Sequence, residues 1–573
     1  MPFMFSRRRT FSLALSLSLS TSLLLVSSRS LAQIAKIKKP KLMLVLVIDQ
    51  FRADQIARFQ KRFLEPQSSS GSLGGFRYLL DRGAYFPFAE YGVLQNMTCP
   101  GHATILSGAY AYQNGIAINE WTDRNSGKTI YCVEDDAYPL VGPNLKADRV
   151  GISPKNFRGS TVGDELKNSG YTSKVVTIAL KDRAAVLLGG YRNDLALWFD
   201  SEQKAWISSR YYRPDGKLPT WVESLNQDIA KDPIKELTWP TPKGEGSGTS
   251  LTKNISINEK TIKSMAENFP HKVSKESVYS LMLPYGTELT VNAAIAAMKN
   301  LKLGQSEDPD LLAVSFSNHD YLSHNFGPNS REVEELTVAE DREISRLLNH
   351  AAKTVGMENI IIVLTADHGA SPTPEWLKAA RVDAGRVDEK KLENMAENFL
   401  QTTFGKPKKD KWLYGVSEFN FFLNVPNIKA ANLDREEVGR KLTLFFRDKM
   451  PELEGIADAF SASDVRNRSL PTKLWEQLIL QTYVADRSGD VILIPKPYFI
   501  VPGSTTTHLS GYSYDRMVPL IIAGPQIKAG AYGQKVGIVD IAPTLAFFAG
   551  TTPPSGSEGR ILSEILIDKD KTK

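Results

Sequence analysis

Three long apolar stretches of this chain each lead to an aspartate, and two of those aspartates have a histidine close by. The stretches are residues 41–49, 311–320 and 360–367, which end on Asp49, Asp320 and Asp367. Unbroken apolar runs of this length are typical of strands buried on both faces of a parallel sheet. In such sheets, ligands bind at the carboxyl ends of the strands. The pattern therefore predicts that carboxylates and imidazoles meet at one sheet edge and bind metal ions there.

Helical stretches alternate with the apolar runs, and this alternation predicts the fold class. Helices are expected at about 163–167, 289–303 and 331–354, and further strands at 174–180 and 517–524. Strands and helices that alternate over such a length indicate an α/β domain with a central, mostly parallel sheet and helices on both faces.

Two regions interrupt the alternation and are expected to leave the central sheet. Residues 201–286 are rich in Trp, Tyr and Pro, whereas residues 371–500 have a helix–strand–helix–strand pattern of their own. In the second region we expect helices near 389–401 and 433–449 and a strand near 412–424. The prediction is one large domain with both regions as insertions, because 573 residues exceed a single typical core.

Residues 1–32 have the pattern of a secretory signal peptide. A basic stretch at 7–9 is followed by an apolar, Leu/Ser-rich stretch at 11–26 and a small-x-small cleavage site at 30–32. An uncleaved anchor helix is the alternative, but serines interrupt the apolar stretch, which is short for a membrane span of about 20 residues. We expect cleavage near Ala32, a catalytic domain over 33–573, and a periplasmic or secreted protein without stable membrane insertion. Export by the Sec or the twin-arginine route stays open.

The remaining composition narrows the range of partners. A content of 42% hydrophobic and 23% charged residues is typical of a soluble globular protein, and the net charge of +6 forms no basic block. Nucleic acid is therefore not an expected partner. The two cysteines, Cys99 and Cys132, do not make a disulfide framework. An exported protein permits a disulfide, and the sequence leaves their pairing open.

Three of the seven histidines accompany carboxylates or follow hydroxyl-rich loops. Asp320 and His324 are four residues apart, which places both on one face of a helix. Each pair alone is more often an ordinary polar pair than a metal site. Zn²⁺ accepts carboxylate oxygen and imidazole nitrogen, and together the candidates are enough for two open sites. The six candidate ligands are Asp49, Asp320, His324, Asp367, His368 and His508.

Thr98 is the candidate nucleophile. It precedes Pro100, which suits the first turn of a helix. A hydroxyl there would face free backbone N–H groups and the positive end of the helix dipole, and a metal ion would lower its pKa. Capping of the helix is the alternative role. The rival nucleophile is Cys99, but Cys-Pro-Gly-His lacks the spacing and the arginine of the sulfatase modification motif, so we expect Cys99 to be structural.

In order along the chain, these motifs resemble those of the alkaline phosphatase superfamily of two-metal hydrolases. The resemblance is to its exported, monomeric phosphatases with a threonine nucleophile, which are related to nucleotide pyrophosphatases/phosphodiesterases. It covers nearly the whole mature chain. The residues that carry it are Asp49, Thr98 within Thr-Cys-Pro-Gly-His, Asn119, Lys181-Asp182-Arg183, Asp320 to His324, Asp367-His368-Gly369 and His508 to Asp515.

The resemblance implies two Zn²⁺ ions and a role for each motif. One ion would be held by Asp320, His324 and His508. The other would be held by Asp49, Asp367 and His368, with Thr98 in contact with it. The phosphoryl oxygens would be contacted by Asn119, Lys181 and Arg183. Leu509 stands where the family commonly has glycine after the last ligand histidine, which puts the conformation of this loop in question.

The implied activity is hydrolysis of small phosphate monoesters through a phosphothreonine, by a monomer. A monoester carries close to two negative charges near neutral pH, and Lys181 and Arg183 offer two cations for them. A solvated charge run is the alternative for these two residues, and phosphodiester hydrolysis on the same scaffold is the alternative activity. A non-catalytic exported binding protein with structural metals is the hypothesis from another class.

Overall fold

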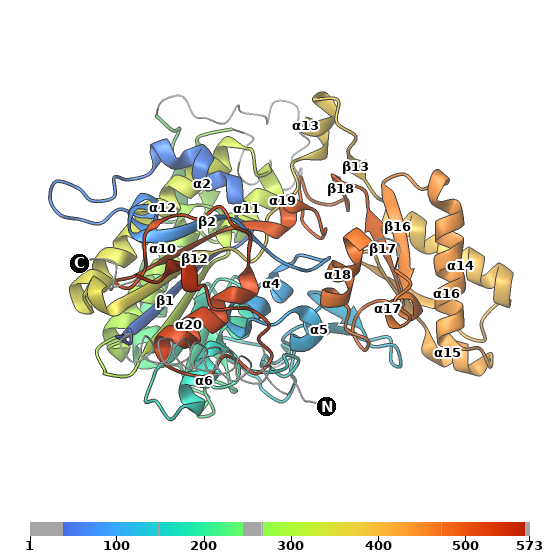
Figure 1. Cartoon of the computed structure of the whole chain (residues 1–573), viewed down its shortest axis with the longest axis horizontal. Coiled ribbons are helices and arrows are strands. Elements are labelled where there is room, and N and C mark those ends of the chain that lie inside the picture. Colours follow the sequence, from blue (N-terminus) through green and yellow to red (C-terminus); the bar gives the residue numbers. More distant parts are fainter. Residues whose placement is uncertain (1–37, 147, 244–264, 266–267, 471–472, 568–573) are drawn as a thin grey trace, which may run out of the picture. The chain divides into compact units, whose positions relative to one another are not determined.

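A mixed sheet of 11 strands lies at the centre of the fold (Figure 1). The computed structural model describes residues 38–146, 148–243, 265, 268–470 and 473–567. Ten of the strands lie side by side in the order β20 (Gly530–Ala531), β2 (Gly83–Glu90), β19 (Met517–Ala523), β12 (Ile360–Thr365), β1 (Leu42–Ile48), β11 (Asp310–Phe316), β6 (Val175–Ala179), β7 (Leu195–Asp200), β8 (Ala205–Ser209) and β5 (Leu140–Val141). The remaining strand, β21 (Val536–Gly537), also pairs with β2.

The three middle strands, β12, β1 and β11, are parallel and in register. Leu42 pairs with Ile360 on one side and Asp310 on the other. Every residue of β1 is 0% exposed, because helices cover both faces of the sheet, and this explains why the strand is apolar throughout. The predicted α/β fold with a mostly parallel sheet is confirmed. β19 departs from the pattern and runs antiparallel to both neighbours.

Two groups of helices cover the sheet (Figure 1). One contains α2 (Ala53–Phe59), α3 (Phe76–Arg82), α10 (Pro284–Leu301) and α12 (Arg331–Thr354), and the other contains α4 (Thr98–Ser107), α6 (Val162–Asn168), α7 (Asp182–Gly189) and α20 (Ile541–Ala549). α12 has the expected bounds because the Ser330 hydroxyl accepts the N–H of Val333 and caps it. α10 begins earlier than expected, with Pro284 in its first turn.

The second of the three apolar stretches ends differently from the prediction. β11 stops at Phe316, and the chain continues as helix α11 (Asn318–Phe326). Asp320 therefore lies in the first turn of a helix rather than at the end of a strand. The helical spacing expected for Asp320 and His324 holds.

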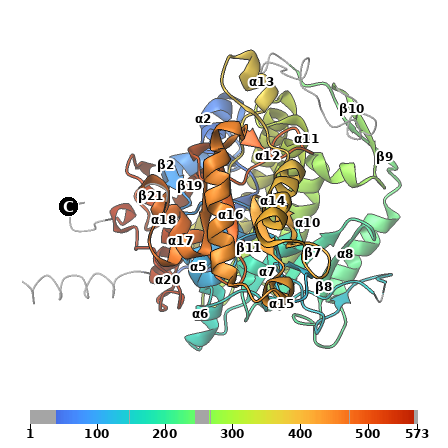
Figure 2. The same ribbon diagram turned by 90° about the vertical axis from the view of Figure 1, so that its right-hand side faces the viewer.

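A smaller sheet lies in the region 371–500. It has the order β14 (Leu413–Ser417), β15 (Asn420–Leu423), β17 (Val491–Pro495), β16 (Ile456–Ser461). Helices α14 (Glu389–Phe404) and α16 (Arg435–Lys449) lie where expected, and both face the viewer in Figure 2. The single strand expected near 412–424 is a hairpin. Its turn residues, Glu418 and Phe419, have φ of 54° and 63° without a glycine, so the usual turn signal is missing.

The region 201–286 begins inside the central sheet, because β8 is the antiparallel neighbour of β7. It continues with α8 (Thr220–Lys231) and the pair β9 (Glu236–Trp239) and β10 (His271–Ser274). The division into one catalytic domain with two insertions remains a proposal.

The expected signal peptide and its cleavage near Ala32 lie outside the described residues. Among the helices of the described part, none combines the length and the apolar character needed to cross a membrane.

Candidate active site

The predicted metal ligands converge at one edge of the central sheet. Asp49 directly follows β1, Asp367 follows β12, and Asp320 lies in the helix that follows β11. These three strands are adjacent and parallel, so their carboxyl ends meet at the same edge. His508 reaches this edge from the loop between β18 (Phe499–Ile500) and α19 (Ser513–Arg516).

In the described part of the chain, three groups of side chains have ligand atoms that all lie within 4.8 Å of one another. The groups are Asp320, His324 and His508; Asp49, Asp320 and His368; and Asp49, His102 and Asp367. The His368 Nε2 atom also lies 3.5 Å from Asp49 Oδ1 and 3.3 Å from Asp367 Oδ2. The fold thus brings all six predicted ligands together and adds His102.

Three of the histidines are held by backbone carbonyls. The Nδ1 atoms of His324, His368 and His508 lie 2.8 Å from Thr506 O, 3.0 Å from Gly369 O and 2.7 Å from Asn96 O. A carbonyl accepts a hydrogen bond, so each Nδ1 carries a proton and Nε2 is the nitrogen left to bind a metal. This arrangement fixes the tautomer that binds a metal.

The unpartnered atoms of the site fit two divalent cations. Among the predicted metal ligands, four buried atoms lack a hydrogen-bond partner in the described part of the chain: Asp49 Oδ1, Asp320 Oδ1, Asp367 Oδ2 and His368 Nε2. Buried polar atoms are rarely left in this state, because the loss of hydration is costly. Oxygen and nitrogen donors at this spacing are the ligands that Zn²⁺ accepts.

The charges of the site are strongly coupled. Burial and the neighbouring Asp367 raise the pKa of Asp49 well above its ordinary value. Burial acts in the same direction on Asp320, but Lys181 and His324 outweigh it and hold the pKa of Asp320 well below its ordinary value. Burial, with His368 and His324 nearby, lowers the pKa of His508 well below its ordinary value, which keeps the imidazole neutral. Neutral imidazole is the form that binds a metal.

Lys181 lies between the carboxylates of Asp49 and Asp320. Its Nζ atom is 2.6 Å from Asp49 Oδ2 and 2.7 Å from Asp320 Oδ2, and it donates to Thr98 Oγ1 at 3.3 Å. The ring of Tyr321 faces the ammonium with its centroid 5.2 Å away. A phosphoryl group bonded to the Thr98 oxygen would therefore be within reach of Lys181.

Thr98 is the first residue of α4, and Met97 occupies the N-cap position. Thr98 is therefore not the N-cap residue, and the alternative capping role is not observed. Gly101 allows the helix to approach the end of β12 closely, since a Cβ at this position would lie 2.3 Å from Asp367 O.

The start of α4 has fewer free backbone N–H groups than the sequence predicted. The Cys99 N–H donates to Asn119 Oδ1 at 2.9 Å, and Pro100 has no N–H. This bond also orients the Asn119 amide, because it leaves the Nδ2 donor on the opposite side of the group. Asn119 is thus hydrogen-bonded to Cys99, the residue that follows Thr98.

Cys99 and Cys132 form a disulfide, which settles the pairing that the sequence left open. Both cysteines are fully buried. Cys132 N donates to Asn119 O at 3.0 Å, so the disulfide, Asn119 and the start of α4 form one connected unit.

Arg183 lies in the first turn of α7 and contacts Tyr131, with Nη1 3.4 Å from the phenol oxygen. Its Nε atom is buried and has no partner among the described residues. Burial disfavours the charged guanidinium, but the neighbouring Tyr131 and Asp182 outweigh it and raise the pKa of Arg183. A charged group in this state is suited to bind an anion.

The sequence interpretation gave no role to His102, Tyr131 or Tyr321. His102 Nδ1 is 3.2 Å from Asp367 Oδ2 and 2.9 Å from Thr98 O, and its Nε2 is 2.9 Å from Ser315 Oγ. Its position four residues after Thr98 on one helix is a signal that was available in the sequence. Tyr131 has no comparable signal, because a short hairpin far from α7 in sequence brings it to Arg183.

Leu509 has a φ of 127°, a conformation that residues with a side chain rarely adopt. The loop therefore keeps the glycine-like conformation although leucine occupies the position. The Leu509 side chain is 7% exposed and belongs to a buried apolar cluster, which holds the loop in place.

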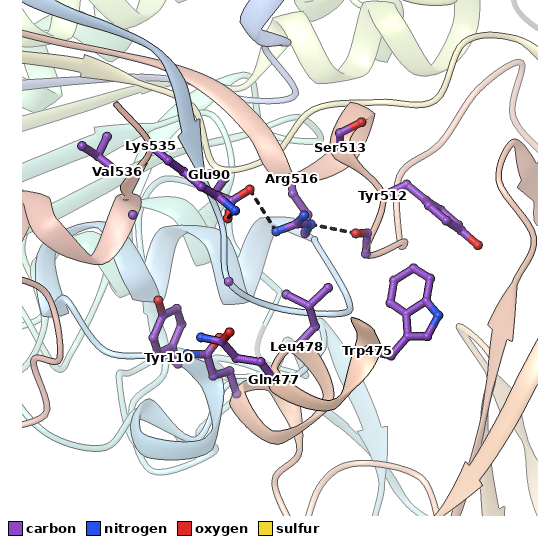
Figure 3. A pocket seen from close by; sticks show the side chains of 14 residues that line it. Glu90, Tyr110, Trp475, Gln477, Leu478, Tyr512, Ser513, Arg516, Lys535 and Val536 are labelled. Atoms are coloured by element: carbon purple, nitrogen blue, oxygen red, sulfur yellow. Dashed lines mark hydrogen bonds and ion pairs between the residues drawn. The ribbon is translucent and has the colours of Figure 1, made fainter. Parts of the chain in front are cut away.

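A separate pocket of about 520 Å³ is shown in Figure 3. Trp475, Tyr512 and Tyr110 contribute aromatic side chains, while Arg516 and Lys535 both pair with Glu90. No predicted site residue lines this pocket.

Comparison with known proteins identifies relatives over most of the chain. The sequence model of the family described as type I phosphodiesterase / nucleotide pyrophosphatase matches residues 43–508. Alkaline phosphatase PhoV of Synechococcus elongatus is 31% identical over 539 residues, which cover 92% of this chain and 94% of PhoV. A protein of Myroides odoratus named calcium-transporting ATPase is 31% identical over 543 residues, covering 93% of this chain and 95% of that protein.

The crystal structure of alkaline phosphatase PafA is similar with a TM-score of 0.79 and 28% identity, over 92% of this chain and 99% of PafA. PafA has also been solved as a variant with a threonine, an asparagine, a lysine and an arginine substituted, with a TM-score of 0.78 and 26% identity over the same shares of the two chains. The four substituted positions are spaced along PafA as Thr98, Asn119, Lys181 and Arg183 are spaced in this chain.

Proposed function

The chain belongs to the type I phosphodiesterase / nucleotide pyrophosphatase family, and from that premise we propose that it is an alkaline phosphatase that hydrolyses phosphate monoesters. Its relatives PhoV and PafA are named alkaline phosphatases. Its substrates are small phosphorylated molecules, and the products are inorganic phosphate and an alcohol.

One observation carries the preference for monoesters: two cations lie at the start of α7, and one of them touches the candidate nucleophile. Lys181 Nζ is 3.3 Å from Thr98 Oγ1, and Arg183 has a buried Nε without a partner in the described part of the chain. A monoester exposes three non-bridging oxygens with close to two negative charges. Two neighbouring cations match that charge, whereas a diester has only one charge to offer.

The residues act in two steps of phosphoryl transfer. The Thr98 hydroxyl gives its proton to solvent and its oxygen attacks phosphorus. The bond to the ester oxygen breaks, and the leaving alkoxide takes a proton from water to become the alcohol. Lys181, Arg183 and the Asn119 amide hold the non-bridging oxygens during this step. Water then attacks the phosphothreonine, which restores the Thr98 hydroxyl and releases inorganic phosphate.

Two Zn²⁺ ions are the proposed cofactors. Asp320, His324 and His508, whose ligand atoms form one close group, would hold one ion. Asp49, Asp367 and His368 would hold the other, next to Thr98, because His368 Nε2 lies 3.5 Å from Asp49 Oδ1 and 3.3 Å from Asp367 Oδ2. Bound there, the ions supply charge that lowers the pKa of the hydroxyl and stabilises the leaving oxygen. The unpartnered carboxylate oxygens and the unpartnered His368 Nε2 atom support this assignment.

Export and a monomeric state complete the proposal. The sequence pattern of residues 1–32 supports cleavage near Ala32 and a periplasmic or secreted location. The resemblance to monomeric, threonine-type phosphatases supports the monomer.

The alternative is phosphodiester hydrolysis, which the description of the matching family favours. A diesterase needs an apolar pocket for its second ester group rather than a second cation. The two activities therefore differ in their dependence on Lys181 and Arg183.

The test is hydrolysis of p-nitrophenyl phosphate, bis-p-nitrophenyl phosphate and p-nitrophenyl sulfate by the mature protein at alkaline pH, with Zn²⁺ and after chelation. A chelator-sensitive preference for the monoester supports the proposal. A preference for the diester overturns the substrate assignment but keeps Thr98 and the metal site. Bound zinc without turnover of any ester would point to a binding protein.

A further inference from the structure

We infer that Tyr131 is a positioning residue that holds the Arg183 guanidinium toward the phosphoryl group, and that the Cys99–Cys132 disulfide fixes its strand to the nucleophile helix. The inference rests on the proposed function and assigns a role to a side chain outside the predicted site. Tyr131 is the last residue of β4 (Thr129–Tyr131), which pairs with β3 (Glu120–Thr122).

The Tyr131 hydroxyl lies between a carboxylate and the guanidinium. It donates a hydrogen bond to Asp182 Oδ1 at 2.6 Å, and its oxygen accepts a hydrogen bond from Arg183 Nη1 at 3.4 Å. Asp182 Oδ1 also accepts the backbone N–H of Arg183 at 2.7 Å. A phenol that donates to a carboxylate is a better acceptor, so the charge of Asp182 orients the guanidinium through Tyr131.

The interposed phenol leaves the Arg183 charge available. A direct, bidentate ion pair with Asp182 would occupy two N–H groups of the guanidinium. No such pair exists among the described residues. Burial and the neighbouring Asp182 raise the pKa of Tyr131 well above its ordinary value, so the phenol stays neutral at alkaline pH. A neutral partner fixes the direction of Arg183 without cancelling its charge.

Both strands of the hairpin are tied to the nucleophile helix at the open end, opposite the turn. Cys132 follows Tyr131 and is bonded to Cys99, which follows Thr98. Asn119 precedes β3 and accepts two hydrogen bonds. Its side-chain Oδ1 accepts one from the Cys99 N–H, and its backbone carbonyl accepts one from the Cys132 N–H. One rigid unit therefore carries Thr98, Asn119 and the partner of Arg183.

The central experiment is Tyr131→Phe, which removes the hydroxyl and keeps the ring. We expect kcat/KM for p-nitrophenyl phosphate to fall about tenfold, the size of one hydrogen bond to a charged group, while bis-p-nitrophenyl phosphate hydrolysis stays unchanged. The matched control is Tyr414→Phe, whose hydroxyl donates to Asn125 O in the turn of the same hairpin, far from Arg183 in the hydrogen-bond network. It should leave both rates unchanged.

A double-mutant cycle separates positioning from general damage. In an Arg183→Ala background, Tyr131→Phe should have no further effect on the monoester rate, because its target is gone. Additive losses, or equal losses for monoester and diester, overturn the inference. If Arg183→Ala itself leaves the monoester preference intact, the proposed function loses its main support. If Arg183→Ala lowers the preference and Tyr131→Phe does not, only the inference fails.

The disulfide is tested with a Cys99→Ala/Cys132→Ala double variant, which avoids reductants that bind zinc. We expect the same selective loss of monoester hydrolysis, with metal content retained. A double variant with the wild-type ratio of monoester to diester rates would overturn the role of the disulfide. The result for Tyr131→Phe stands independently if the double variant does not fold.

Discussion

Single side chains decide what the sheet edge is able to bind. The three ligand histidines each give Nδ1 to a backbone carbonyl, and the unpartnered carboxylate oxygens lie beside their Nε2 atoms. Thr98 lies next to this group in the first turn of α4, where its hydroxyl oxygen accepts a hydrogen bond from Lys181. Leu509, the residue after one ligand histidine, holds a conformation that favours glycine.

The first prediction concerns the nucleophile. Thr98→Ala should lower kcat for p-nitrophenyl phosphate by about 1000-fold or more, because the attacking oxygen is lost, while Thr98→Ser keeps that oxygen and most of the activity. Rapid quench with a radiolabelled monoester should trap phosphoprotein in the serine variant and in the wild type. Unchanged turnover by Thr98→Ala would exclude a covalent role for this residue.

The second prediction concerns the strain at Leu509. Both Leu509→Ala and Leu509→Gly lose the buried side chain, but glycine also relieves the φ of 127°. A strained backbone of this kind costs about 1–3 kcal/mol. The free energy of unfolding should therefore be higher for Leu509→Gly than for Leu509→Ala.

The control for this comparison is Leu392 in α14, which is also buried but has a helical backbone. There glycine should be worse than alanine by about 1 kcal/mol. Chemical denaturation of the four variants checks the reversal. The same order at both positions would show that the Leu509 conformation stores no strain.

Helices and strands determine which side chains meet. The carboxyl ends of three adjacent parallel strands bring Asp49, Asp320 and Asp367 to one edge. Gly101 allows α4 to approach Asp367. The β3–β4 hairpin and the β14–β15 hairpin approach α7 from other parts of the chain, and the second of them brings an acidic residue, Glu418, into the field of Arg183.

The third prediction concerns the turn of the β14–β15 hairpin. Burial, with Glu389 and Glu120 nearby and Arg183 opposing them, raises the pKa of Glu418 to about 8. The unfolded chain releases this proton near its ordinary pKa of 4.5, whereas the folded protein keeps it up to about pH 8. Stability therefore falls as the pH rises from 4.5 to 8, and the full loss persists above pH 8.

Glu418→Gln removes this titration and keeps the shape of the side chain. Its Tm should exceed that of the wild type at pH 9 and differ little at pH 4.5. Glu437→Gln is the control, because this exposed residue in α16 pairs with Arg440 and has a pKa lowered by that hydrogen bond. An equal Tm difference for Glu418→Gln at both pH values would rule out the shifted carboxyl.

Across the whole chain, metal binding couples the site to the stability of the fold. The ligands come from the segments that follow β1 and β12, from helix α11 and from the loop that carries His508, which are far apart in sequence. A cation that binds the folded but not the unfolded protein stabilises it by about 4 kcal/mol at 1000 times its Kd. The coupling should be visible in the unfolding of the entire domain.

The fourth prediction is that chelation lowers Tm by several degrees and that added Zn²⁺ restores it. A Asp320→Asn/His324→Gln double variant should respond much less, because one of the two ligand groups is lost. Differential scanning calorimetry with metal analysis checks both. A Tm that ignores the chelator while activity is lost would mean that the metal is bound too weakly to support the fold.

The core and most of the candidate site were predictable from the amino-acid sequence. Apolar stretches long enough to be buried on both faces specify parallel strands in the middle of a sheet, and the residues that end such strands must meet at one edge. That is why Asp49 and Asp367 were predictable from the chain, and the helical spacing of Asp320 and His324 was local information of the same kind. Thr98 was a candidate from its place before Pro100 at the start of a predicted helix, whereas Asn119, Lys181 and Arg183 came from a resemblance carried by short motifs.

Contacts between segments that are distant in sequence became visible in the folded protein alone. The disulfide between Cys99 and Cys132, the position of Tyr131 beside Arg183 and the approach of His102 to Asp367 depend on how separate elements pack. The φ of Leu509 is likewise imposed from outside, because a leucine alone would avoid it. Local sequence encodes local preference, whereas these features arise where packing energy from the whole fold outweighs that preference.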